Sequence, residues 1–172
     1  MASLKGRLLV AAPVLADPNF HRTVVLVLEH LDDDGAVGVV LNRPTDVLVH
    51  AALPDWDRVA AAPSVVFVGG PVAEGSALCL GRLPGAEAVE VVDLERDPDD
   101  VAAEQIRLFV GYAGWGPGQL EDEIEEGAWF VVDAHPDDPL SDDPEGLWTR
   151  VLRRQRGHLR LLALYPPSPS VN

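Results

Sequence analysis

The sequence predicts an α+β fold: a strongly curved, mainly antiparallel sheet, partly closed like a barrel, with a few short helices outside it. About eight apolar runs of strand length outnumber three or four short helical patterns. Two of these runs form a hairpin near the N-terminus, whereas a doubly wound sheet would alternate strands with helices. Bends or bulges are expected where a proline or glycine lies in or beside a run, at Pro13, Gly38, Gly69, Gly81 and Gly111.

The N-terminal runs predict three strands. Leu8–Leu15 is broken at Pro13, which suits a bend or a sheet edge. Thr23–His30 and Ala36–Asn42 are rich in β-branched residues, and the residues 31–35 between them (LDDDG) are typical of a hairpin turn. Because both runs are almost continuously apolar, we expect both of their faces to be covered.

The middle of the chain predicts a helix followed by strands. Thr45–Leu53 has the pattern of a short capped helix. Ser64–Val68 is a predicted strand that ends at residues 69–71 (GGP), where glycine freedom and proline rigidity produce a turn. Further strands are predicted at Ala77–Leu83 and Ala88–Leu94, and a turn of helix near Val101–Gln105.

We expect the rest of the chain to be arranged around the stretch Arg107–Val132. An apolar run enters a glycine-rich turn at residues 111–118, and a short acidic helix and a second apolar run follow. Pro117 suits the first helical position with Gly116 as the cap, and Gly127 suits a left-handed C-terminal cap. The buried helix face is predicted to hold two residues four apart, Leu120 and Ile124.

The C-terminal part predicts one helix and one strand. The helix begins at Pro144 and runs to about Gln155, with Trp148 on its buried face. Leu159–Tyr165 is predicted to be a last strand, and residues 166–172 (PPSPSVN) a disordered tail. Because no linker divides the chain, residues 1–165 are expected to form a single domain.

The amino-acid composition excludes several classes of function and site. The net charge is −15, from 28 acidic and 13 basic residues, and such a surface argues against direct binding to nucleic acid. The lone Cys79 excludes an internal disulfide and a cysteine-built zinc site. We find no signal peptide and no apolar run long enough to span a membrane, so a soluble cytoplasmic protein is expected. The oligomeric state stays open.

The charge is unevenly distributed along the chain. Residues 93–145 hold 17 acids and 2 bases, whereas residues 146–172 hold 5 arginines and no acid. The basic C-terminal segment is therefore expected to pack near the acidic middle, or to meet an acidic neighbour in an oligomer.

A candidate ligand site lies in the turns. Arg43, beside Asn42 at the end of a predicted strand, can hold a carboxylate or phosphate with paired donors. The competing interpretation is a structural turn in which Arg43 pairs with an acid, and in which the nearby aromatic residues belong to the core. The candidate ligand-binding residues are Asn42, Arg43, Gly69, Gly70, Tyr112, Trp115 and Gln119.

Other motifs support chemistry less well. Residues 32–35 (DDDG) lack the ligand spacing of a calcium loop and indicate a solvated hairpin tip. His135, Asp137 and Asp138 could hold a divalent ion together with Asp133, although a histidine among prolines and aspartates is more typical of a loop. No catalytic triad can be assembled, so we predict no catalytic residue, no metal and no cofactor.

Four blocks of residues resemble a known family. They are residues 19–24 (NFHRTV); Gly35-Ala36 continuing to Asn42-Arg43-Pro44; Gly69-Gly70-Pro71; and Gly111-Tyr112-Ala113 with Trp115, Gln119-Leu120, Glu123 and Trp129. In this order and spacing they resemble the YqgE/AlgH family of bacterial proteins. The resemblance spans residues 6–129, and the last block is its most specific part.

That resemblance implies a bifurcated, mostly antiparallel sheet folded into a pseudo-barrel. Some members of the family carry the label of transcriptional regulator, but the family has no agreed biochemical activity. Many members have a histidine near the position of Leu80, so any role of that histidine is absent from this chain.

Three functional hypotheses follow. The first, which we favour, is a non-enzymatic regulatory or binding protein that acts through an unknown protein partner or a small ligand. The second is a metal-assisted hydrolase that uses acidic residues near Asp133–Asp143. The third is a direct transcriptional regulator, for which Arg150–Arg160 is the only basic feature and which the net charge disfavours.

Overall fold

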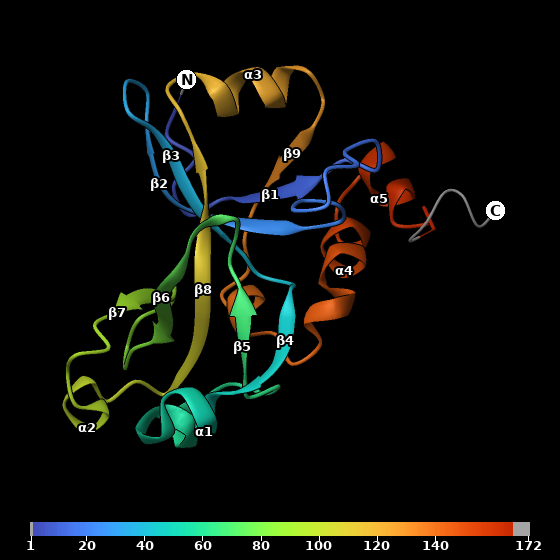
Figure 1. The fold of residues 1–172 in the computed structure, drawn as a ribbon. Coiled ribbons are helices and arrows are strands. Elements are labelled where there is room, and N and C mark those ends of the chain that lie inside the picture. The colour runs from blue at the N-terminus through green and yellow to red at the C-terminus, as the bar shows by residue number, and fades with distance from the viewer. Residues whose placement is uncertain (1, 167–172) are drawn as a thin grey trace.

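The structure is a computed structural model that describes residues 2–166 (Figure 1). The described residues form nine strands: β1 (Leu8–Ala11), β2 (Val24–Leu31), β3 (Gly35–Val40), β4 (Pro44–Leu48), β5 (Val65–Val68), β6 (Val72–Arg82), β7 (Glu90–Val92), β8 (Gln105–Trp115) and β9 (Trp129–Val132). They also form short α-helices, α1 (Val49–Ala52), α2 (Pro98–Val101), α3 (Gln119–Glu125), α4 (Leu147–Arg153) and α5 (His158–Leu162), and the 3-10 turns Pro54–Val59, Asp138–Leu140 and Pro144–Gly146.

The sheet branches at β8, which runs through the middle of the molecule in Figure 1. The C-terminal end of β8 pairs with β3, with Trp115 opposite Ala36. The N-terminal part pairs with β5 in parallel and with β6 antiparallel, so that Phe109 lies between Phe67 and Leu78. We call β3, β2, β1 and β9 the upper arm, and β4, β5, β6 and β7 the lower arm.

The expected α+β fold is confirmed. All strand pairs except β5 with β8 are antiparallel, and the helices are short. The predicted hairpin is also present, as β2 and β3. In its turn Gly35 has φ +95°, and a Cβ there would lie 2.0 Å from the carbonyl oxygen of Trp115, so only glycine fits.

Each of three apolar clusters contains at least one buried tryptophan. Trp148 of α4 packs against the sheet together with residues of β1, β2 and β8. Trp115 and Trp129 lie in the upper arm below α3, and Trp56 lies in the lower arm beside Ile106. All four tryptophans are at most 6% exposed, so Trp115 and Trp129 belong to the core, whereas Tyr112 is half-buried.

The helix predicted at Thr45–Leu53 is mostly wrong. Residues 44–48 form β4, which pairs with β5, and only Val49–Ala52 is helical. The Thr45 hydroxyl donates to the carbonyl of Val66 at 2.6 Å, so the β-branched residues here are used for sheet pairing rather than for a helix.

The strand predicted at Leu159–Tyr165 is also wrong, because this segment contains α5. Leu159, Leu162 and Ala163 face the first apolar cluster, whereas Leu161 is 64% exposed. Spacings of three and four residues between inward side chains are helical. This periodicity was overlooked in the sequence because most residues of the segment are apolar.

Smaller differences concern element boundaries. Helix α3 begins at Gln119 behind Gly118 (φ +76°) rather than at Pro117, while Leu120 is buried and Gly127 (φ +83°) ends the helix as predicted. The expected glycine-rich turn is largely strand, because β8 continues to Trp115.

Near the C-terminus, Pro144 starts a 3-10 turn before α4, and Trp148 is buried as expected, together with Val151 and Leu152. The helical turn expected near residues 101–105 lies earlier, at Pro98–Val101. Most of the predicted tail, residues 167–172, lies outside the described residues. Within residues 2–166, no helix has the length and apolar character needed to cross a membrane.

Candidate functional site

Three glycines allow two backbone segments to cross without side chains between them. The chain that links β5 to β6 passes over β8 at Gly69 and Gly70. A Cβ on Gly70 would lie 2.2 Å from the carbonyl carbon of Tyr112, and a Cβ on Gly111 would lie 2.3 Å from the carbonyl oxygen of Gly70. At Gly69 the nearest atom would be the Gly111 oxygen, at 2.4 Å. We call these three residues the glycine crossing; its backbone groups touch one another, which leaves no cradle for a phosphate.

Asn42 holds a strained turn. Its Oδ1 accepts a hydrogen bond from the amide of Val24 at 3.0 Å, and its Nδ2 donates to the carbonyl of Arg22 at 2.9 Å. Arg22 has φ +57°, a conformation that costs a non-glycine residue roughly 1–2 kcal/mol. The two bonds of Asn42 therefore fix the backbone on both sides of Thr23, directly after Arg22.

Arg43 donates to main-chain carbonyls rather than to an acid. Its two terminal nitrogens bond to the carbonyls of Pro18 and His21, each at 3.0 Å. Burial lowers the pKa of Arg43, and the nearby charge of Asp17 raises it in part. The hollow beside Arg43 and Gly70 has a volume of only about 40 Å³, far below the roughly 300–1,000 Å³ of small-molecule sites.

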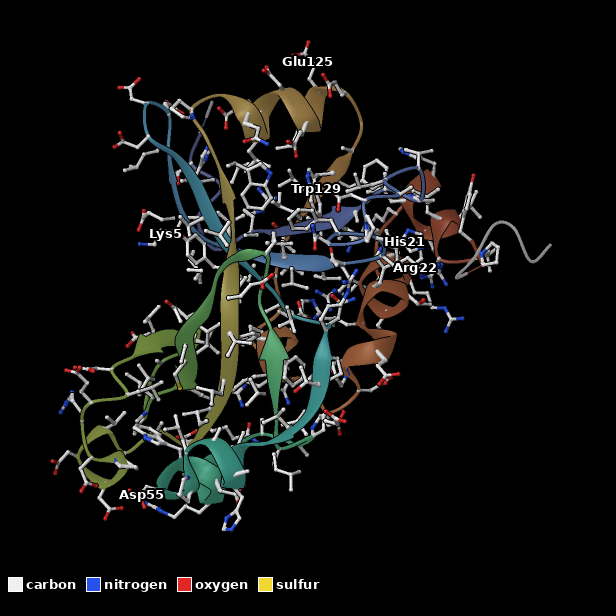
Figure 2. The ribbon with its side chains drawn as sticks, viewed as in Figure 1. Lys5, His21, Arg22, Asp55, Glu125 and Trp129 are labelled. Carbon is white, nitrogen blue, oxygen red and sulfur yellow. The ribbon has the colours of Figure 1, made fainter. Side chains whose placement is uncertain are left out.

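Trp115 and Gln119 belong to a different cluster, whose centre is Glu123. The Nε1 atoms of Trp115 and Trp129 donate to Glu123 Oε1 at 3.1 and 3.0 Å, and Gln119 Nε2 donates to Glu123 Oε2 at 2.8 Å. In Figure 2, Trp129 lies below α3, and Glu125 lies on the outer side of that helix. We call Glu123 and the two tryptophans the indole clamp.

The structure thus divides the predicted ligand-binding residues into two groups. Gly69 and Gly70 lie at the glycine crossing, where Tyr112 adjoins them through its backbone, and Arg43 shares a small hollow with Gly70. Asn42 is bonded to Arg22 and Val24. The other two, Trp115 and Gln119, lie at the indole clamp. The role of Glu123 was missed; the available signal was that two buried indoles each need an acceptor.

Four of the five acids in residues 133–143 form an ion pair with an arginine. Four pairs are present: Asp133 with Arg7 (3.1 Å), Asp137 with Arg82 (2.7 Å), Asp138 with Arg154 (2.5 Å) and Asp143 with Arg150 (2.9 Å). Within residues 2–166, no three His, Cys, Asp or Glu side chains are grouped as metal ligands would be. Two of the pairs join the acidic middle to the basic C-terminal segment, as the charge distribution predicted.

Arg107 is a buried structural arginine. It is 2% exposed, and its terminal nitrogens donate to four carbonyls, those of Ala61, Ala62, Pro139 and Ser141, at 2.8–3.3 Å. Its guanidinium also lies 4.3 Å from the ring centre of Phe67. Burial lowers the pKa of Arg107 from 12.5 to about 10, and Asp142 opposes that shift. Arg107 therefore ties two loops to β8.

A mainly apolar crevice separates the two arms. Its volume is about 570 Å³, within the roughly 300–1,000 Å³ of small-molecule sites. Its walls come from β2 of the upper arm, from β6, β7 and the chain before β7 in the lower arm, and from residues 134–139. The apolar lining consists chiefly of Leu26, Leu28, Leu80, Val89, Val91, Ala134 and Pro139, and the charged or polar side chains are Lys5, Glu29, Glu87, Glu90 and His135.

The crevice was missed from the sequence, because its walls meet only in the fold. Leu80 belongs to this lining, at the position where the family resemblance noted a histidine in many members. Two other hollows, of about 670 and 640 Å³, are lined mostly by ion-paired charges or by polar loops. Cavity size alone therefore does not single out the crevice, whereas its apolar lining does.

Cys79 of β6 is not a nucleophile in this geometry. Its side chain is buried in the lower-arm cluster, and burial raises the pKa of its thiol to about 12. A thiol with that pKa carries almost no thiolate near neutral pH.

Known proteins share both the sequence and the fold. The family described as AlgH-like, DUF179, matches residues 8–160. A UPF0301 protein of Streptomyces coelicolor is 53% identical over all of this chain and 97% of its own length, and one of Thermobifida fusca is 44% identical over 99% of this chain and 96% of its own.

Two solved structures are similar. The crystal structure of a Corynebacterium diphtheriae protein has a TM-score of 0.88 and 33% identity, covering 96% of this chain and 93% of that one. The solution structure of AlgH from Pseudomonas aeruginosa has a TM-score of 0.65 and 29% identity, covering 96% and 95%. The chain therefore belongs to the AlgH-like UPF0301 family, for which no biochemical activity is established.

Proposed function

We propose that the protein is a non-enzymatic binding protein with a regulatory role, and that it takes a small organic ligand into the crevice between its arms. The observation that supports this most is an apolar hollow of ligand size, with charged groups at its rim. The proposed place of action is the cytoplasm, on the sequence grounds given above.

The surroundings of the crevice favour binding over catalysis. Among its described lining residues, His135 is exposed, and the backbone amide of His135 is held by Asp138 Oδ2 at 2.8 Å. Asp138 itself accepts two hydrogen bonds from Arg154, so its charge is already neutralised. A metal-assisted hydrolase would need the neighbouring acids to be available, and arginines occupy them instead.

The proposal is tested by following backbone amide NMR signals while neutral apolar probes such as octan-1-ol and cyclohexanol are added. We expect saturable shifts for amides around the crevice, such as those of Leu28, Val89 and Ala134. The variant Ala88→Trp places a large ring at the exposed rim and should abolish the shifts. Ala51→Trp is the matched control, because Ala51 is also exposed but lies on α1 and does not line the crevice.

Two results would contradict the proposal. Shifts that survive Ala88→Trp would assign the probes to another surface, and a complete lack of saturable shifts would remove the crevice as a binding site. Shifts centred on Arg43, Gly70 and Tyr112 would instead favour the site predicted from sequence, which stays a proposal of its own.

Direct regulation through DNA is the less favoured candidate. Of the five arginines in the basic segment, Arg150 and Arg154 are bound to Asp143 and Asp138, which leaves less positive charge for phosphates. A gel shift at low salt that showed tight, sequence-selective binding would restore this hypothesis.

A further inference from the structure

The charge at the rim of the crevice indicates what the ligand carries. Glu29 of the upper arm and Glu87 and Glu90 of the lower arm are among the lining residues, so acidic residues border the crevice on both sides. The single lysine of the rim, Lys5, is 3.4 Å from Glu29 and thus compensates one of the three acids. Lys5 is labelled in Figure 2, at the level where the arms separate.

The remaining two acids have no cationic partner within the described part of the chain. Glu87 and Glu90 make no ion pair there, and both are exposed. This differs from residues 133–143, where arginines neutralise four of the carboxylates. The crevice mouth therefore has a net negative charge, on a protein whose total charge is −15.

From this combination, and resting on the proposed function, we propose that the crevice binds an amphiphilic cation: an organic molecule with an apolar body and an amine or guanidinium end. The apolar body would lie against Leu28, Leu80 and Val89, where water is displaced from aliphatic surface. The cationic end would lie at the mouth, between Glu87 and Glu90 on one side and Glu29 on the other.

A ligand with an anionic end fits this rim poorly. A carboxylate or phosphate would find one lysine, already beside Glu29, and would be repelled by the two unpaired acids. The negative potential of the whole protein acts in the same direction, because it lowers the local concentration of anions and raises that of cations.

Three probes with the same octyl chain and different end groups separate the two proposals: octylamine, octan-1-ol and octanoate, titrated below their aggregation limits at about 20 mM salt, where screening is weak. We expect octylamine to bind roughly tenfold more tightly than octanoate, from about threefold for each unpaired exposed carboxylate, with octan-1-ol between them. Raising the salt to about 0.5 M should narrow that difference, because the Debye length falls to a few ångströms.

The double substitution Glu87→Gln with Glu90→Gln should remove most of the preference for octylamine while octan-1-ol binds as before. The matched control is Glu125→Gln with Glu126→Gln, which removes the same charge from the exposed face of α3, away from the crevice. Because all four glutamates are exposed, both double variants are expected to fold.

The outcomes are distinguishable. Equal binding of the three probes, or tighter binding of octanoate, overturns the charge inference but leaves the crevice as a binding site. Octylamine binding that is insensitive to Ala88→Trp is adsorption to the acidic surface and also overturns it. If no probe binds saturably, the proposed function fails together with this inference.

Discussion

The glycine crossing and the crevice show two opposite ways in which segments of one branched sheet lie beside each other. At the crossing, Gly69, Gly70 and Gly111 bring main-chain atoms into direct contact, so no side chain separates the segments. At the crevice, β2 and β7 face each other without any ladder pairing between them, and aliphatic side chains line the space. The difference teaches that main-chain contact at the branch point leaves no space for a side chain, whereas the open side of the branch has a hollow of ligand size.

This comparison predicts the largest loss of stability at the crossing. Gly111→Ala should lower the free energy of unfolding by about 3 kcal/mol or more, because φ +73° costs alanine roughly 1–2 kcal/mol and the Cβ would lie 2.3 Å from the Gly70 oxygen. Urea unfolding measures the effect. Gly75→Ala is the control, since a Cβ at that position would meet no atom within 4 Å, and a change of at most about 0.5 kcal/mol is expected there. Equal effects of the two variants would contradict the structural role of the crossing.

A large effect is also expected where the lower arm is tied to the C-terminal loops. Arg107→Lys should cost roughly 2–4 kcal/mol, because a lysine ammonium cannot bond four carbonyls from two segments as the forked guanidinium does. Arg82→Lys is the control at a more exposed ion pair, with an expected loss below about 1 kcal/mol. Both are measured by urea unfolding, and a loss at position 107 no greater than at position 82 would show that the four carbonyl bonds matter little.

The indole clamp should show an intermediate effect. Glu123→Ala leaves the N–H groups of Trp115 and Trp129 without their acceptor, which is expected to cost about 1–3 kcal/mol. Glu123→Gln keeps an oxygen acceptor and should cost less. Glu125→Ala, on the exposed face of the same helix, serves as the control. Urea unfolding followed by tryptophan fluorescence measures the loss of stability, and a Gln variant as unstable as the Ala variant would argue against hydrogen bonding as the cause.

The smallest effect on stability is expected in the crevice itself. Val91→Thr changes little volume at a side chain that is 61% exposed, so the free energy of unfolding should change by at most about 0.5 kcal/mol. The same substitution places a hydroxyl against the apolar body of the ligand and should weaken octan-1-ol binding several-fold. A large loss of stability with unchanged octan-1-ol binding would mean that the crevice supports the fold, as the glycine crossing does, and does not bind the ligand.

Much of the fold could be predicted because its signals are local. The β2–β3 hairpin follows from two β-branched runs around an acidic turn, and α3 follows from Leu120, Gly127 and the acidic residues between them. The errors arose where two local patterns competed. Thr45–Leu53 has the local pattern of a short helix, but its first residues pair with β5 as a strand. Leu159–Tyr165 has the composition of a strand, but it forms α5, whose inward side chains pack with helical spacing against the first apolar cluster.

The candidate site could be predicted only in part. The sequence singled out Asn42, Arg43 and the glycines, and the structure shows them bonded to main-chain groups or packed against them. It could not single out the crevice, whose residues look like ordinary strand and loop positions one at a time.

By itself, then, the sequence determined the class of fold, the acidic composition and the family. Only the tertiary structure decided which acids are neutralised and which are not, and where the two arms leave space between them. The physical reason is the distance along the chain over which each interaction acts. Strand and turn preferences act between neighbouring residues. The pairing of Asp138 with Arg154 and the separation of β2 from β7 depend instead on segments that come together only in the folded, branched sheet.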